Sequence, residues 1–86
     1  MTQAIPRISP LYRMQYEATQ ARWVLLYPEG MVRLNSAAAE ILRRVDGVKT
    51  VDALVGDLQH AFPGADLRGD VLQFLHEGQE RGWLLC

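Results

Sequence analysis

The chain has 86 residues, a net charge of −1 and a hydrophobic content of 49%. This length accommodates one small domain with a single core, and the apolar content is that of a globular chain, not a disordered one. A near-neutral charge argues against a nucleic-acid partner and against an anionic membrane surface, since both favour clustered Lys and Arg. The apolar runs are also far too short to span a bilayer, so we expect no membrane partner.

Cysteine usage points to the compartment. The single cysteine, Cys86, stands at the last position of the sequence, so no internal disulfide can form. The first residues contain no long apolar stretch of the kind that a signal peptide needs. These features predict a cytoplasmic location.

The first part of the chain divides into an arm and a strand. Residues 1–10 include two prolines and show little periodicity, so we expect a flexible N-terminal arm there. Residues 11–16 alternate, with Tyr12, Met14 and Tyr16 on one side, as in a half-buried strand. Residues 11–86 are then expected to form one domain.

A hairpin is predicted over residues 23–34, where two apolar runs flank Pro28-Glu29-Gly30. A type I turn closed by a glycine gives a three-residue loop, which would pair Met31 with Tyr27. In this register one side of the sheet, expected to face the helices, carries Val24, Leu26, Val32 and Leu34. The opposite side carries Trp23, Leu25 and Tyr27, which suggests a partner or dimer face, and coverage by the N-terminal arm is the alternative.

Three helices are expected after the hairpin. Asn35 and Thr50 are good N-caps for the first two, and Asp66 is the expected cap of the third. Apolar residues recur at helical spacing after each cap. Gly82 fits the position that follows a helix C-terminus, with Trp83 folding back. The predicted fold class is therefore α+β and winged-helix-like, with a three-stranded antiparallel sheet followed by three helices.

The residues give little support to catalysis. His60 and His76 lie in different predicted helices without a second ligand at helical spacing, which argues against a metal site. Cys86 has no neighbouring base, and no glycine-rich phosphate loop follows a strand. The third helix, which would read DNA in a winged helix, has a neutral to acidic outer face. We therefore expect no enzyme activity, no cofactor, no metal and no nucleic acid.

The predicted third strand, residues 31–34, invites a binding hypothesis. It is short, last in the sheet and followed at once by a helix cap, so its outer backbone groups would lack partners. It has no proline and one charge, Arg33, so the usual protection of an edge strand is weak. An extended peptide could add there as a fourth strand. A covered or self-paired edge is the alternative, and the residues alone leave both open.

An ordered set of motifs resembles a known family. The motifs are Leu25-Leu-Tyr-Pro-Glu-Gly30, Leu34-Asn35, Asp46-Gly47, Phe62-Pro63-Gly64 and Gly82-Trp83. Together they resemble the PqqD family, the small peptide chaperones of pyrroloquinoline quinone (PQQ) biosynthesis, from about Pro10 to Leu84. Members of this family are recognition elements for ribosomally made, post-translationally modified peptides (RiPPs).

The resemblance implies a function. It implies a non-catalytic adaptor that binds a short, PqqA-like precursor peptide and presents it to a PqqE-like radical S-adenosylmethionine (SAM) enzyme. In similar domains the peptide adds beside the third strand and lies against the third helix, and Gly78 would let it approach closely. The site that the resemblance implies consists of Met31, Val32, Arg33, Leu34, Leu67, Asp70, Val71, Phe74, Leu75 and Gly78.

A second class of function stays open at this point. An open strand edge and an apolar sheet face would also suit a winged-helix module with a structural or regulatory role that forms a homodimer through its sheet. Size-exclusion chromatography with and without the peptide separates the two hypotheses.

Overall fold

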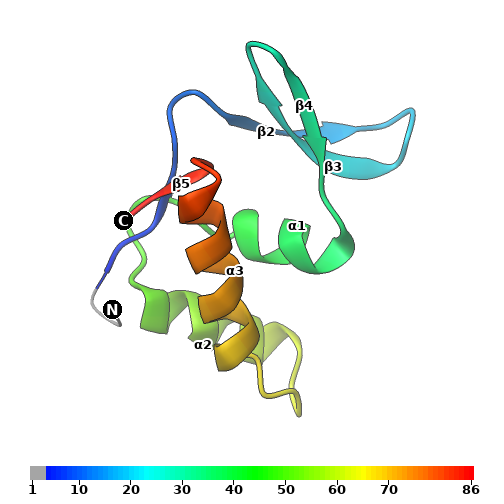
Figure 1. Ribbon diagram of the computed structural model, residues 1–86. Coiled ribbons are helices and arrows are strands. Elements are labelled where there is room, and N and C mark those ends of the chain that lie inside the picture. Colours follow the sequence, from blue (N-terminus) through cyan, green and yellow to red (C-terminus); the bar gives the residue numbers. More distant parts are fainter. Residues whose placement is uncertain (1–3) are drawn as a thin grey trace.

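The computed structural model describes residues 4–86. Figure 1 shows a sheet standing above three helices, with the blue N-terminal strand beside the red C-terminal strand at the left. The elements in chain order are β1 (Arg7–Ile8), β2 (Arg13–Glu17), β3 (Arg22–Tyr27), β4 (Gly30–Arg33), α1 (Ser36–Leu42), α2 (Val51–Ala61), α3 (Arg68–Glu80) and β5 (Leu84–Leu85). The predicted α+β class is confirmed, with a three-stranded antiparallel sheet β2-β3-β4 and three helices. The structure also contains a second, two-stranded sheet, β1-β5, which was not predicted.

The hairpin register differs from the prediction. Tyr27 pairs with Gly30 and Leu25 pairs with Val32, so the loop contains only Pro28 and Glu29. The predicted three-residue loop is wrong because Gly30 begins the strand instead of ending the turn. A shift of one residue moves every β4 side chain to the other face relative to β3.

The core therefore lies on the sheet face that was expected to be free. Leu25 is 0% exposed within the main core, and Trp23 packs against that core. Tyr27 is half-buried, with its ring centroid 5.3 Å from that of Tyr12. The assignment of Trp23, Leu25 and Tyr27 to an outward partner or dimer face is wrong, because this face carries Val32 and packs on the helices.

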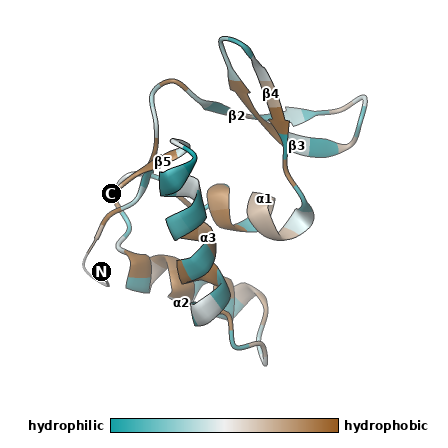
Figure 2. Ribbon diagram, in the orientation of Figure 1, coloured by the Kyte–Doolittle hydropathy of each residue, from teal (hydrophilic) through white to brown (hydrophobic). Residues whose placement is uncertain are grey.

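The helix starts follow the sequence in two of three cases. The Asn35 side chain accepts a hydrogen bond from the Ala38 N–H at 2.8 Å, and the Thr50 hydroxyl accepts one from the Ala53 N–H at 3.1 Å. Both predicted caps are confirmed. Asp66 does not cap the third helix, because that helix begins at Arg68 and has no side-chain cap. Figure 2 shows apolar colour along α2, whose buried stripe faces the other helices.

The C-terminal cap turns the chain back onto α3. Gly82 has a φ of +82°, and the Trp83 N–H donates to the Gly78 carbonyl at 2.8 Å. The Gly82 N–H donates to the Gln79 carbonyl at 3.1 Å, which completes a Schellman motif. This reversal brings Leu84 onto Gly78, where an added Cβ would lie 2.6 Å from Leu84 Cδ1.

The N-terminal segment packs on the domain. The flexible arm was predicted over residues 1–10, of which 1–3 lie outside the described residues. In residues 4–10, β1 pairs with β5, and the Ser9 N–H donates to the Trp83 carbonyl at 2.8 Å. Pro6 is fully buried, and the Val51 N–H donates to the Ala4 carbonyl at 2.9 Å. Residues 4–10 therefore belong to the folded domain, in contrast to the prediction, because the C-terminal strand offers them a backbone partner.

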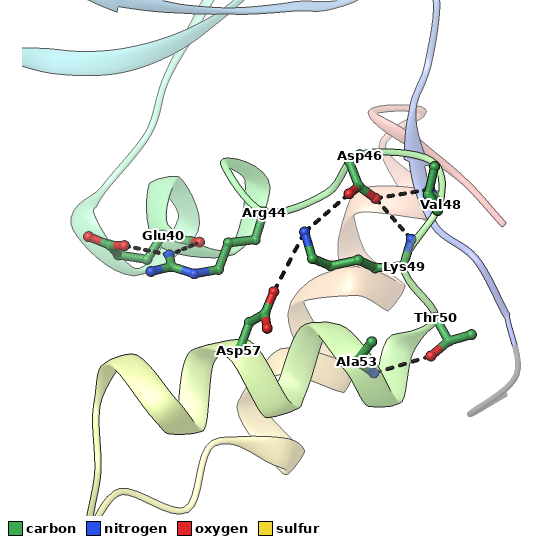
Figure 3. A network of polar contacts seen from close by, with 8 residues as sticks. All are labelled: Glu40, Arg44, Asp46, Val48, Lys49, Thr50, Ala53 and Asp57. Carbon is green, nitrogen blue, oxygen red and sulfur yellow. Dashed lines mark hydrogen bonds and ion pairs between the residues drawn. The ribbon is translucent and has the colours of Figure 1, made fainter.

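A network of hydrogen bonds and ion pairs holds the loop between α1 and α2 (Figure 3). The Asp46 carboxylate accepts hydrogen bonds from the N–H groups of Lys49 and Val48, each at 2.9 Å. Lys49 Nζ lies 3.1 Å from Asp46 Oδ2 and 3.5 Å from Asp57 Oδ2. The backbone hydrogen bond from Lys49 contributes most, and together with that from Val48 it lowers the pKa of Asp46 from 3.8 to about 2.

This network predicts an acid-sensitive term in the folding stability. A carboxylate with a lowered pKa stabilises the fold above its unfolded pKa, and the effect is lost as the pH falls from about 4 to about 2. We expect the Asp46→Asn variant to lose less stability than the parent chain across that interval. Urea denaturation at several pH values measures this, with the exposed Asp66→Asn as control. Parallel pH profiles of the parent and the Asp46→Asn variant would contradict the assignment.

Candidate functional site

Strand β4 is an edge of the sheet with a row of outward backbone groups. The Leu34 N–H donates to the Trp23 carbonyl of β3 at 3.0 Å. Because N–H directions alternate along an antiparallel strand, the Val32 N–H also points toward β3. The N–H and C=O groups of Met31 and Arg33 then point away from the sheet. Within residues 4–86 no strand pairs with this outer side of β4.

A groove of about 500 Å³ lies beside this edge, between β4, the start of α1 and α3. We call it the edge groove. Its strand wall consists of Val32 and Arg33 of β4 and continues into Leu34 and Asn35. The α1 part consists of Ala37, Ala38 and Ile41, and the opposite wall consists of Asp70, Phe74, Glu77, Arg81 and Trp83.

The α3 wall is one face of the helix with aromatic and charged groups. Asp70, Phe74, Glu77 and Arg81 recur at helical spacing, so they line up along the groove. The Phe74 and Trp83 ring centroids are 6.4 Å apart, and the Arg81 guanidinium lies 5.4 Å from the Trp83 ring. Within the described chain the charged groups of this wall have no ion-pair partner within 4.0 Å.

A second hollow of about 340 Å³ opens between α1, the end of α2 and the start of α3. We call it the helix hollow. Its lining consists of Ser36, Ala37, Glu40, Ile41, Leu58, Phe62, Leu67, Asp70 and Val71. The two hollows share Ala37, Ile41 and Asp70, so they adjoin each other.

Most of the sequence-predicted site residues come together around these hollows. The edge groove is lined by Val32, Arg33, Leu34, Asp70 and Phe74, whereas Leu67 and Val71 line the helix hollow with Asp70. Met31 contributes its backbone to the edge, while its side chain is 42% exposed on the outer face of the sheet.

Besides Met31, two predicted residues line neither hollow. Leu75 is buried in the main core, and Gly78 is buried beneath Leu84. Gly78 was expected to let a guest peptide approach closely, but the side chain of Leu84 occupies that space. The sequence pattern of α3 does not reveal this packing, because Leu84 reaches Gly78 only through the chain reversal at Gly82.

Sequence reasoning missed several groove residues. Glu77 and Arg81 follow Asp70 by seven and eleven positions, a helical spacing that could have identified them. Trp83 was expected to fold back, but its position in the wall depends on the Schellman motif and on β5. The α1 residues of the groove depend on how α1 sits beside β4.

The site offers features of a peptide-binding surface. It combines outward backbone donors and acceptors, an apolar floor and charges of both signs, which suit an extended chain. Residues 4–86 contain no group of three or more His, Cys, Asp or Glu side chains arranged to hold a metal ion. In the same part of the chain no helix is both long enough and apolar enough to cross a bilayer.

Comparisons with known proteins identify the family of this chain. Residues 22–84 match the sequence model of the family described as "Coenzyme PQQ synthesis protein D (PqqD)". The chain is 47% identical over 81 residues to the "PqqA binding protein" of Azotobacter vinelandii, covering 93% of this chain and 88% of that protein. It is also 47% identical over 83 residues to the protein of that name from Kluyvera intermedia, covering 95% and 90%.

A solved structure is similar along the whole chain. It is the solution NMR structure of the PqqD truncation of Methylobacterium extorquens PqqCD, described as a functional and stand-alone RiPP recognition element. Its sequence is 27% identical, the TM-score is 0.75, and the match covers 100% of this chain and 94% of that one. On the family match, the relatives and this shared fold, the chain belongs to the PqqD family of coenzyme PQQ synthesis proteins.

Proposed function

We propose that this chain is a non-catalytic adaptor in PQQ biosynthesis that binds a PqqA-like precursor peptide by strand addition to β4. The open backbone edge beside a groove is the observation that carries the proposal. The names of the relatives, which are PqqA binding proteins, and the recognition-element description of the similar structure support it.

The peptide forms a fourth strand antiparallel to β4. Its backbone pairs with the outward groups of Met31 and Arg33, and alternate side chains enter the edge groove against Phe74 and Trp83. Main-chain pairing tolerates many sequences, so the side-chain contacts must select the partner. Ordering a flexible peptide offsets part of the contact energy, so we expect an affinity nearer micromolar than picomolar.

The adaptor presents the bound peptide to a PqqE-like radical SAM enzyme in the cytoplasm. Strand addition holds only the segment that lies beside β4, so the rest of the peptide stays accessible to an enzyme. The similar M. extorquens structure is itself part of a longer PqqCD chain, in which a recognition element is joined to another protein. This supports a role in combination with larger partners.

An Arg33→Pro variant tests the strand pairing. Because the Arg33 N–H points outward, a proline there removes one donor to the guest and leaves the β3–β4 bonds intact. We expect peptide binding to weaken by about tenfold or more, measured by isothermal titration calorimetry with synthetic PqqA peptide. Arg33→Ala is the matched control, since it removes the same charge and keeps the N–H.

Val32→Pro provides the opposite case. Its N–H points toward β3, so proline should open the hairpin and destabilise the fold, visible by circular dichroism and thermal melting. Unchanged affinity in a folded Arg33→Pro variant would refute strand addition at this edge.

Homodimerisation through the same edge is the competing hypothesis, since a second copy of β4 could also pair there. Analytical ultracentrifugation with and without the peptide separates the two. A monomer that binds one peptide favours the adaptor, whereas a dimer that the peptide leaves unchanged favours the alternative.

A further inference from the structure

The helix hollow is an apolar site at one end of the edge groove. Leu58, Phe62, Leu67 and Val71 supply its apolar walls from α2, α3 and the loop between them. Phe62 is 42% exposed at the end of α2. An open hollow of this kind, with apolar walls and an exposed aromatic side chain, has the lining that apolar groups of a ligand need.

The hollow adjoins the edge groove. Ala37, Ile41 and Asp70 line both hollows, so the two share one rim. A peptide in the edge groove can therefore extend into the helix hollow without leaving the surface. Its volume of about 340 Å³ is ample for one large aliphatic or aromatic side chain.

The direction of β4 fixes which end of the guest reaches the hollow. The strand runs from Gly30 to Arg33, and the chain then enters α1 at Ser36, a residue of the hollow. The helix hollow thus lies beyond the C-terminal end of β4. A guest antiparallel to β4 reaches it with the residues on the N-terminal side of its paired segment.

We propose that the helix hollow binds a bulky apolar side chain, such as Leu, Ile, Met or Phe, on the N-terminal side of the guest's paired segment. This rests on the proposed function and adds a second, specificity-determining site to it. The Asp70 carboxylate stands where the two hollows meet and disfavours an acidic guest residue. Glu40, the other carboxylate of the lining, is paired with Arg44 at 2.7 Å.

A Phe62→Ser variant tests the inference. It removes an exposed wall of the helix hollow, and its backbone N–H can still donate to the Leu58 carbonyl. We expect binding of synthetic PqqA peptide to weaken by about tenfold, with an unchanged circular dichroism spectrum. Val48→Ser is the matched control, since Val48 is 76% exposed and lies in neither hollow, and its affinity should equal that of the parent.

Alanine scanning of the peptide identifies the anchor. Alanine in place of one bulky apolar peptide residue, N-terminal to the paired segment, should weaken binding to the parent protein. The same peptide substitution should weaken binding to the Phe62→Ser variant hardly any further. Intermolecular nuclear Overhauser effects should join this residue to the methyl groups of Leu58 and Leu67.

The outcomes separate the two hypotheses. If the parent binds the peptide and Arg33→Pro weakens binding, but Phe62→Ser matches Val48→Ser, the hollow is not used and the inference fails alone. An anchor on the C-terminal side of the paired segment also overturns it. If the parent does not bind the peptide, or binds it with no effect of Arg33→Pro, the proposed function fails.

Discussion

Replacing Leu25 with alanine should lower the free energy of unfolding by about 2–5 kcal/mol. Leu25 is 0% exposed in the core between the sheet and the helices, so the truncation leaves a cavity that the surroundings fill only in part. For a domain of this size such a loss is a large share of the total stability. The sequence-based register, which put Leu25 on the sheet face away from the helices, does not place it in this core.

Leu26→Ala is the matched control, because it removes the same groups from the next residue on the other face of β3. Leu26 is only half-buried and pairs with Met31 outside the core, so we expect a clearly smaller loss. Urea denaturation followed by circular dichroism gives both values. Equal losses in the two variants would mean that the face assignment is incorrect.

Replacing Gly78 with alanine should destabilise the fold by about 1–3 kcal/mol, although alanine favours helices. The new Cβ would lie 2.6 Å from Leu84 Cδ1 and 3.2 Å from Leu84 Cγ. Leu84 is 2% exposed, so it has little room to move aside. Because Trp83 precedes Leu84 and lines the edge groove, we also expect weaker peptide binding.

Gly56→Ala is the matched control in a neighbouring helix. An added Cβ at Gly56 meets no atom within 4 Å, so the same substitution should stabilise the fold by about 0.4–1 kcal/mol. The double variant Gly78→Ala with Leu84→Ala relieves the clash and should be less destabilised than the sum of the two single changes. Thermal and urea melts measure the cycle, and strict additivity would contradict the contact.

The local features of this protein could be predicted from its sequence. The caps at Asn35 and Thr50 and the reversal at Gly82 depend on hydrogen bonds between residues a few positions apart. The helix stripes and the strand alternation are likewise local periodicities, so they predicted an α+β fold with an edge strand before α1. The family motifs follow the same local features.

Tertiary structure alone decided the faces and the hollows. The sequence around Gly30 is compatible with a hairpin loop of two residues and with one of three. The packing of Leu25 against the helices selects the register that has the two-residue loop. The β1-β5 pairing and the two adjoining hollows join segments distant in sequence. Such contacts depend on how the whole chain buries its apolar surface, and a local sequence pattern does not contain this information.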